Sequence, residues 1–223
     1  KGSGMIQPNM GTMLIYIFIE CEASKQLMTR LLKNNLENTF NSITVDSDTS
    51  TSDTLMMFSV GNKKIHLHKN NFKILNNKMH DLMHDLSLQV IKDGEGVSKL
   101  IKVNIFSART KHQAKRIAFS IANSPLVKTA IAGEDANWGR VIMAIGKTEE
   151  KINQNKIIVL FGNNVVCENG SISKKINIRK LNHYMKNKII DINVKLNLGK
   201  FSHTVYGNDL TLEYLKINAD YRS

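Results

Sequence analysis

Apolar and polar residues follow two different periods along the chain, and these predict a mixture of strands and helices. An unbroken apolar run at residues 13–19 and segments rich in strand-forming residues at 55–60 and 99–106 predict strands. Helical spacing predicts a helix that Ser24 caps and that continues to about residue 38, a second over 76–91, a third that Thr110 caps, and a fourth over 138–145.

The pattern changes after Thr148, where short runs of strand-forming residues follow one another. Pro125 and Gly133 interrupt the segment before residues 138–145. We expect one short helix over 179–186, and we expect strands at 156–161, 165–167, 189–198, 201–206 and 210–217. With no internal repeat in view, the fold class expected is mixed α/β.

The composition of the 223 residues, 42% hydrophobic and 22% charged, fits a globular protein with one large domain or two small ones. The longest apolar run is far shorter than the roughly 20 residues of a membrane-spanning helix, so we expect no span. Cys21 and Cys167 lack C-x-x-C partners, which fits a reducing compartment, and we expect the cytoplasm. The chain begins at Lys1 without a visible secretory leader, and we interpret it as a fragment.

The net charge is +12, from 31 Lys and Arg against 19 Asp and Glu, and a basic face of that size could bind nucleic acid through its phosphates. The basic residues are spread along the whole chain, however, and no aromatic-rich nucleic-acid motif accompanies them. We therefore expect a solvated surface, with no nucleic acid and no membrane among the partners.

Two patterns suggest metal ligands, and neither is sufficient. His80 and His84 lie four residues apart on a predicted helix, but the sequence offers no third ligand, so they are expected on its polar face. The acidic and hydroxyl-rich run at residues 46–53 lacks the Gly and Glu of an EF-hand, because Thr51 and Met57 occupy those positions. Such a run more often satisfies backbone groups in a loop, and we expect no metal site.

Thr12 offers a different chemistry, although a Thr at the start of a strand is usually only a strand residue. It follows Gly11, whose missing Cβ lets a hydroxyl approach the preceding carbonyl closely. An N-to-O acyl shift followed by hydrolysis would leave Thr12 as a new N-terminus with an amine of pKa about 7.7–8.0. That amine could take the proton of the Thr12 hydroxyl, which makes Thr12 a candidate nucleophile.

Several longer strings carry more specific information. Residues 1–14 are KGSGMIQPNMGTML, and later motifs are TVDSDTSTSDT at 44–54, DGEG at 93–96, IANSPLVKTA at 121–130, GEDANWGR at 133–140, YGNDLT at 206–211 and KINADYRS at 216–223. In this order they resemble the ornithine acetyltransferase family, the bifunctional glutamate N-acetyltransferases of arginine biosynthesis. The first string matches the family's cleavage site, and the last resembles its C-terminus.

The resemblance implies that a precursor cuts itself between Gly11 and Thr12. The sequence would then be the β chain, preceded by the last eleven residues of the α chain. Thr12 would take acetyl from N-acetylornithine and pass it to glutamate by a ping-pong route through an acetyl-threonine ester. No cofactor is implied, although acetyl-CoA is a possible co-substrate.

The family's substrate contacts fall on Lys1, Thr12, Glu95, Asn218 and Ser223. Glu95 could pair with an α-ammonium, and Lys1 with a carboxylate or an acyl oxygen. Asn218 and Ser223 could bind polar ends of the substrate through neutral hydrogen bonds.

Some positions depart from the family's pattern, and some of its residues lie elsewhere. Gly11 replaces a usual Ala, Asn208 a usual Cys, and Ser223 a common Thr. The family's oxyanion-hole Thr-Gly pair belongs to the α chain. Because the loss of one oxyanion donor typically lowers the rate by about 10²–10³, this chain alone should be a poor catalyst.

The resemblance also implies a layered α/β architecture whose self-processing chemistry is similar to that of N-terminal nucleophile hydrolases. We place a domain boundary near Ile91. Residues 1–91, which include the end of the α chain at 1–11, would complete the N-terminal domain, and 92–223 would form the C-terminal domain. The expected assembly is an αβ heterodimer that pairs into α₂β₂. A bifunctional enzyme that also uses acetyl-CoA and a truncated, non-catalytic structural partner remain the alternatives.

Overall fold

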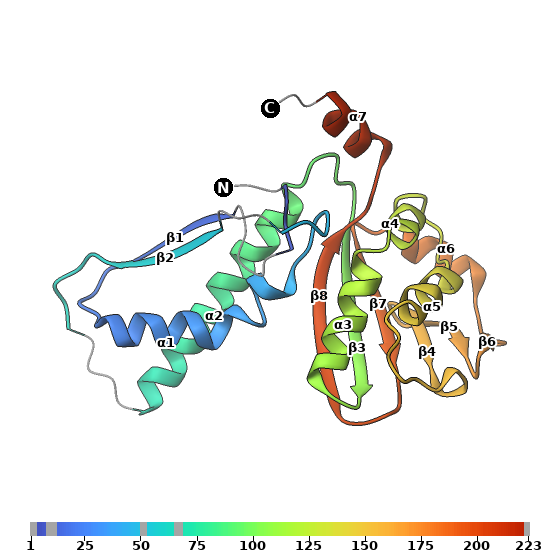
Figure 1. The fold of residues 1–223 in the computed structure, drawn as a ribbon, viewed down its shortest axis with the longest axis horizontal. Helices are drawn as coiled ribbons and strands as arrows, with labels where there is room; N and C mark the ends of the chain where they lie inside the picture. The colour runs from blue at the N-terminus through green and yellow to red at the C-terminus, as the bar shows by residue number, and fades with distance from the viewer. Residues whose placement is uncertain (1–3, 8–12, 50–52, 65–68, 221–223) are drawn as a thin grey trace. The chain divides into compact units, whose positions relative to one another are not determined.

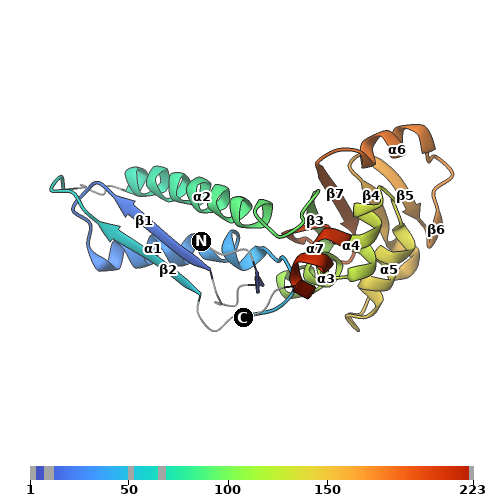
Figure 2. The same ribbon diagram turned by 90° about the horizontal axis from the view of Figure 1, so that it is seen from above.

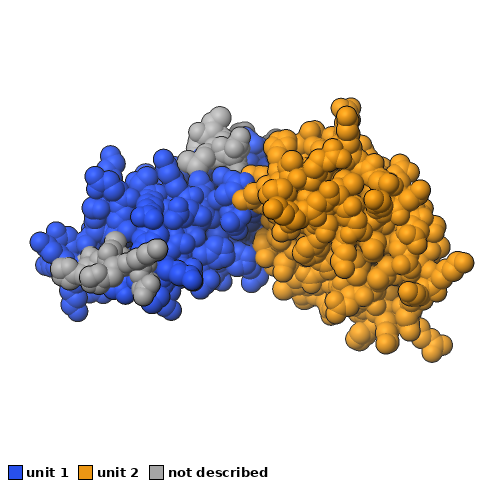
Figure 3. Space-filling view, turned by 90° about the horizontal axis from the view of Figure 1, so that it is seen from below, with its two compact units in different colours: residues 1–93 blue, residues 94–223 orange. Residues whose placement is uncertain are grey.

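The structure is a computed structural model that describes residues 4–7, 13–49, 53–64 and 69–220. It divides into two compact units, Lys1–Asp93 and Gly94–Ser223, which Figure 3 colours blue and orange. The division falls just beyond Ile91, where the sequence suggests a domain boundary.

The first unit contains a small parallel sheet. Strands β1 (Leu14–Ile19) and β2 (Thr54–Ser59) pair in register from Leu14 opposite Thr54 to Ile19 opposite Ser59. Within the described residues no further strand joins this sheet. The predicted strands at 13–19 and 55–60 are therefore confirmed, and they pair with each other.

Helices cover one face of these two strands (Figures 1 and 2). The predicted cap on α1 (Lys25–Leu36) is confirmed, because the Ser24 hydroxyl accepts a hydrogen bond from the Leu27 amide at 3.2 Å. A short 3₁₀ helix follows, η1 (Phe40–Ser42), and then the long helix α2 (Lys69–Lys92), which begins earlier than the sequence predicts. The core of the unit is apolar and includes Ile15, Ile17, Leu31, Phe40, Ile43, Met79 and Met83.

The second unit is built on a six-stranded mixed sheet. Across the sheet the strands are β6 (Ser171–Ile172), β5 (Asn164–Glu168), β4 (Ile158–Phe161), β7 (Ile189–Lys195), β3 (Leu100–Ala108) and β8 (Phe201–Asn208). Only β3 and β7 run parallel to each other, while the other neighbours are antiparallel. The mixed α/β class expected from the sequence is confirmed.

One face of this sheet carries the core. Helices α3 (Lys111–Ala122), α4 (Pro125–Ala132) and α5 (Trp138–Gly146) lie against it, as Figure 2 shows. A short 3₁₀ helix, η2 (Gln154–Lys156), leads into β4, and α6 (Ile178–Met185) precedes β7. Alternate residues of the central strands, such as Val103 and Ile192, are fully buried there. The predicted cap on α3 is confirmed, since the Thr110 hydroxyl accepts from the Gln113 amide at 3.0 Å.

The prediction of a strand at 210–217 is wrong, because this segment is helix α7 (Leu212–Asp220). Its Leu, Tyr and Ile residues suggest a strand, but the Thr211 hydroxyl accepts a hydrogen bond from the Tyr214 amide at 3.3 Å and so begins a helix. Helix α4 and strand β6 are not predicted from the sequence.

No helix in the described parts of the chain is both long enough and apolar enough to cross a membrane.

Candidate active site

Glu95 lies in the turn that connects α2 to β3. Gly96 follows it with a φ of +63°, in the left-handed region that glycine adopts without strain. A Cβ at Gly96 would overlap the Tyr214 amide nitrogen, so the turn and α7 approach each other closely. Glycine at this position therefore permits both the turn and the contact with α7.

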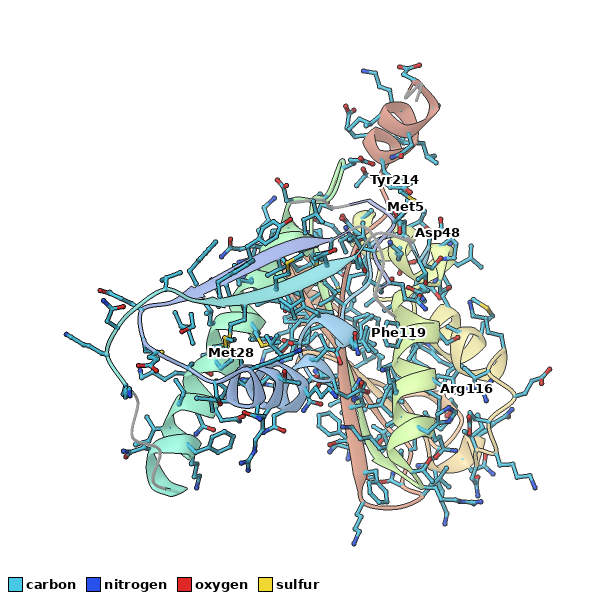
Figure 4. All side chains as sticks on the ribbon, turned by 60° about the vertical axis from the view of Figure 1, so that its left-hand side comes forward. Met5, Met28, Asp48, Arg116, Phe119 and Tyr214 are labelled. Carbon is cyan, nitrogen blue, oxygen red and sulfur yellow. The ribbon has the colours of Figure 1, made fainter. Side chains whose placement is uncertain are left out.

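Asn218 meets Glu95 directly. The Asn218 side-chain amide donates to Glu95 Oε2 at 2.7 Å, and the two residues are 123 positions apart in the sequence. The same amide donates to the carbonyl of Tyr214, one helical turn earlier, at 3.0 Å; Tyr214 is labelled in Figure 4. Two of the five substrate contacts implied by the resemblance thus form one hydrogen-bonded pair within the second unit.

The remaining site residues, Lys1, Gly11, Thr12 and Ser223, lie outside the described residues. The structure does describe Met13, which follows Thr12 in the first unit and is buried. Its amide donates to the Asp53 carboxylate, and its carbonyl accepts from the Thr54 amide at 2.6 Å. The backbone of Met13, which directly follows the candidate nucleophile in the sequence, is therefore held at its amide by Asp53 and at its carbonyl by Thr54, the first residue of β2.

Asp53, in the first unit, is the neighbour of Met13 that sequence reasoning missed. Its Oδ2 is buried and has no hydrogen-bond partner among the described residues, and burial raises the pKa of the carboxyl from 3.8 to about 6. The sequence places Asp53 in a loop rich in Asp, Ser and Thr, and only the pairing of β1 with β2 brings it to Met13. No signal in the sequence would have singled it out.

The role expected for the other acidic residues of that loop is confirmed at Asp46. Its carboxylate accepts from the amides of Met5 at 2.6 Å, Ile6 at 2.9 Å and Asp48 at 3.3 Å. Asp46 therefore satisfies backbone donors, as Asx turns do.

The two histidines lie side by side on α2, with the ring centroids of His80 and His84 5.9 Å apart and His80 Nδ1 3.5 Å from Asp81 Oδ1. Within the described ranges, no three His, Cys, Asp or Glu side chains gather closely enough to hold a metal ion.

Asn208, which departs from the family's usual Cys, contacts a buried cation. Lys128 is only 6% exposed, and its Nζ lies 3.1 Å from Asn208 Oδ1. An amide oxygen accepts this hydrogen bond better than a thiol, so the substitution suits its surroundings.

Comparison with known proteins identifies the family. The sequence model of the ArgJ family matches residues 1–223. The chain belongs to the ArgJ family. The family assignment made from the motifs is therefore confirmed.

The relatives carry the same family name. The arginine biosynthesis bifunctional protein ArgJ of Bartonella henselae is 46% identical over 227 residues, which include all of this chain and 55% of the relative. The protein of that name from Rhizobium meliloti is 44% identical over 233 residues, with all of this chain and 56% of the relative. The chain thus spans a little over half the length of the curated ArgJ relatives it matches.

A solved ArgJ structure has the same fold. The crystal structure of the arginine biosynthesis bifunctional protein ArgJ from Bacillus halodurans matches with a TM-score of 0.87 and 33% sequence identity. The match covers 94% of this chain and the whole of that chain. The mixed α/β fold with its six-stranded sheet is therefore shared with this ArgJ protein.

Proposed function

We propose that the complete protein is a glutamate N-acetyltransferase that moves acetyl from N-acetylornithine to glutamate, after cleavage between Gly11 and Thr12. The family membership of residues 1–223 supports an acetyltransferase of arginine biosynthesis. The observation that carries the proposal is the 2.7 Å hydrogen bond between Asn218 and Glu95, which brings two of the implied substrate contacts together. No cofactor enters the proposed reaction.

In the first half of the reaction, the α-amine of Thr12 takes the proton of the Thr12 hydroxyl. The alkoxide attacks the acetyl carbonyl of N-acetylornithine and forms a C–O bond. The C–N bond then breaks, and the ornithine amine leaves with the proton. An amine of pKa about 7.7–8.0 suits this work near neutral pH.

In the second half, the amine of glutamate attacks the acetyl-threonine ester. The C–O bond to Thr12 breaks, the hydroxyl regains a proton, and N-acetylglutamate leaves. This order makes ornithine the first product and regenerates the enzyme without any other reactant.

Glu95 provides the negative charge that a substrate ammonium requires. In N-acetylornithine this is the side-chain ammonium, because the α-amine carries the acetyl group. Asn218 donates to one carboxylate oxygen, Oε2, and fixes the orientation of the carboxylate. Oε1 is then the oxygen that we assign to the substrate. Lys1 and Ser223 complete the proposed contacts, with Lys1 binding a carboxylate or an acyl oxygen.

The first unit supports the proposed need for an α chain. Its sheet has two parallel strands, and parallel strands are normally covered on both faces by other elements. The face opposite the helices leaves Tyr16 50% and Phe18 62% exposed. We therefore propose that the α chain completes this unit in an αβ heterodimer, and that two heterodimers form α₂β₂.

The proposed location is the cytoplasm, where the free and buried thiols of Cys21 and Cys167 would stay reduced. The word bifunctional in the names of the relatives favours a second activity, the synthesis of N-acetylglutamate from acetyl-CoA. Assays with each acetyl donor separate an enzyme with one activity from one with two.

The test uses the protein expressed from its complete gene. Intact mass should show cleavage before Thr12, and the cleaved protein should transfer acetyl from N-acetylornithine to glutamate. Thr12→Ala should remain uncut and inactive. Glu95→Gln keeps the shape of the side chain and removes its charge, so KM should rise about tenfold or more, as expected for a hydrogen bond to a charged group. An uncut and inactive wild-type protein would favour the non-catalytic structural partner instead.

A further inference from the structure

Two distant segments of the second unit are joined by a set of polar contacts that no motif predicts. Asp209 is buried, with 4% of its surface exposed. Its Oδ1 accepts from the amides of Ser98 at 2.9 Å and Lys99 at 3.1 Å, and its Oδ2 accepts from the Ser98 hydroxyl. The Asp209 amide donates back to the Lys99 carbonyl at 3.1 Å. Asp209 thus ties the end of β8 to the segment that follows the Glu95 turn.

Thr211 makes the second link. Its hydroxyl donates to the Gly96 carbonyl at 2.7 Å and accepts from the Tyr214 amide at 3.3 Å. One hydroxyl therefore caps α7 and binds that helix to the residue next to Glu95. We call the contacts of Ser98, Asp209 and Thr211 the α7 clasp.

Apolar burial does not hold α7 in place. None of its nine residues is buried, and Leu212 and Leu215 are 84% and 55% exposed. The helix can therefore turn or shift at little hydrophobic cost. A turn by one residue is a rotation of about 100°, which would carry the Asn218 amide away from Glu95.

We propose that the α7 clasp is a positioning device, in which Thr211 and Asp209 set the rotation of α7 so that Asn218 meets Glu95 in the geometry that binds substrate. The inference rests on the proposed function, because it assumes that Glu95 and Asn218 contact the substrate. Thr211 and Asp209 themselves are positioning residues, since they act through Asn218.

The expected effect is on substrate binding more than on the chemical step. The Asn218–Glu95 hydrogen bond orients a carboxylate that is proposed to hold a substrate ammonium, and that positive charge is the same in the bound substrate and in the transition state. Loss of the clasp should raise KM and leave kcat nearly unchanged, as expected for binding that is uniform between the bound substrate and the transition state.

The test is Thr211→Val in the complete enzyme, because Val keeps the shape of Thr and lacks the hydroxyl. The matched control is Thr110→Val, which also removes a capping hydroxyl, at α3, but one whose hydrogen bond goes to Gln113 and not to the Glu95 turn. Thr211→Ser, which restores the hydroxyl, should rescue the defect. Amide hydrogen exchange of residues 212–220 provides a readout that does not depend on activity.

We expect Thr211→Val to speed exchange in residues 212–220, to leave exchange in β3 unchanged, and to raise KM about fivefold, roughly what the loss of one hydrogen bond is worth. Unchanged exchange would overturn the clasp, and faster exchange with an unchanged KM would overturn its positioning role. An equal rise in KM in Thr110→Val would also overturn that role. If the wild-type enzyme transfers no acetyl, the proposed function fails, while the exchange experiment still decides whether the clasp holds α7.

Discussion

The sheets of the two units differ in how far other elements cover their faces. In the second unit, the sheet buries one continuous apolar face under helices, and residues such as Val103, Ile192 and Ile117 are fully buried. In the first unit, helices cover one face of β1 and β2, and the other face carries exposed aromatic side chains. The rings of Phe18 and Phe58 stack there with centroids 5.1 Å apart.

This difference indicates which unit is structurally complete. Monomeric proteins rarely expose contiguous apolar patches, and those that they expose often mark interfaces. The second unit has the core of an independent domain, whereas the exposed aromatic face of the first is where the proposed α chain would bind.

The sharpest way to break this comparison is to separate the units. Residues 94–223 expressed alone should unfold cooperatively on heating, because their core lies within the fragment. Residues 1–93 expressed alone should show no cooperative transition. Circular dichroism of each fragment during heating, at concentrations where both are monomeric, makes the measurement. A cooperative transition in monomeric 1–93 would contradict the comparison.

Substitutions within the sheets should show the same contrast. Ile192→Ala in β7 leaves a cavity among fully buried side chains and should lower the free energy of unfolding by about 2–5 kcal/mol. Phe18→Ser, on the exposed face of β1, should change the free energy of unfolding by only about 0.5 kcal/mol when residues 1–223 are studied without the proposed α chain. Urea unfolding measures both.

The same Phe18→Ser variant should have a large effect once the proposed α chain is present. If the aromatic face is covered there, the polar side chain should weaken association, and less α chain should remain bound on gel filtration. Phe106, 39% exposed on β3 of the second unit, provides the control as Phe106→Ser. Equal loss of α chain from both variants would argue against a specific interface on β1.

The contrast also explains what the sequence could predict. Strands and helices whose apolar residues face a core within the chain follow the expected periods. The sequence therefore predicts β1 and β3 close to their observed bounds and α3 at its observed start. The prediction failed at α7, where no apolar face is buried and a single hydroxyl, that of Thr211, starts the helix. Periodicity carries information only where burial imposes it.

The site divides in the same manner. The motifs implied Glu95 and Asn218, but the hydrogen bond between them depends on long-range contacts of Asp209 and Thr211 that no local pattern reveals. Asp53 escaped notice because its contact with Met13 depends on the register of β1 against β2. The motifs therefore identify Glu95 and Asn218 as candidates, while the residues proposed to position them are visible only in the tertiary structure.

Substitution of one glycine in each unit would test whether the two units unfold independently. A Cβ at Gly61 would lie 2.6 Å from the Cys21 amide nitrogen, and one at Gly199 would lie 2.5 Å from the Ala108 carbonyl oxygen. Both overlaps involve backbone, which cannot yield as a side chain can, so each Gly→Ala substitution should cost about 1–3 kcal/mol. Hydrogen exchange should quicken near β1 and β2 in Gly61→Ala and near β3 and β8 in Gly199→Ala. Exchange that quickens throughout both units in either variant would show that they unfold together.

The most local expected effect is a pH dependence confined to the first unit. Burial raises the pKa of Asp53 to about 6, so the folded state holds the proton more tightly than the unfolded state, whose value is near 3.8. The contribution of this group to stability is therefore fully present below about pH 4 and is lost as pH rises through about 6.

Hydrogen exchange near β1, corrected for the intrinsic dependence of exchange on pH, should show this loss in the wild type. Asp53→Asn cannot titrate and should flatten the profile, while β3 and β7 should show no difference between the two proteins. A wild-type profile that stays flat from pH 4 to 7 would mean that water reaches the Asp53 carboxylate, and the start of β1 would then be less enclosed than the structure indicates.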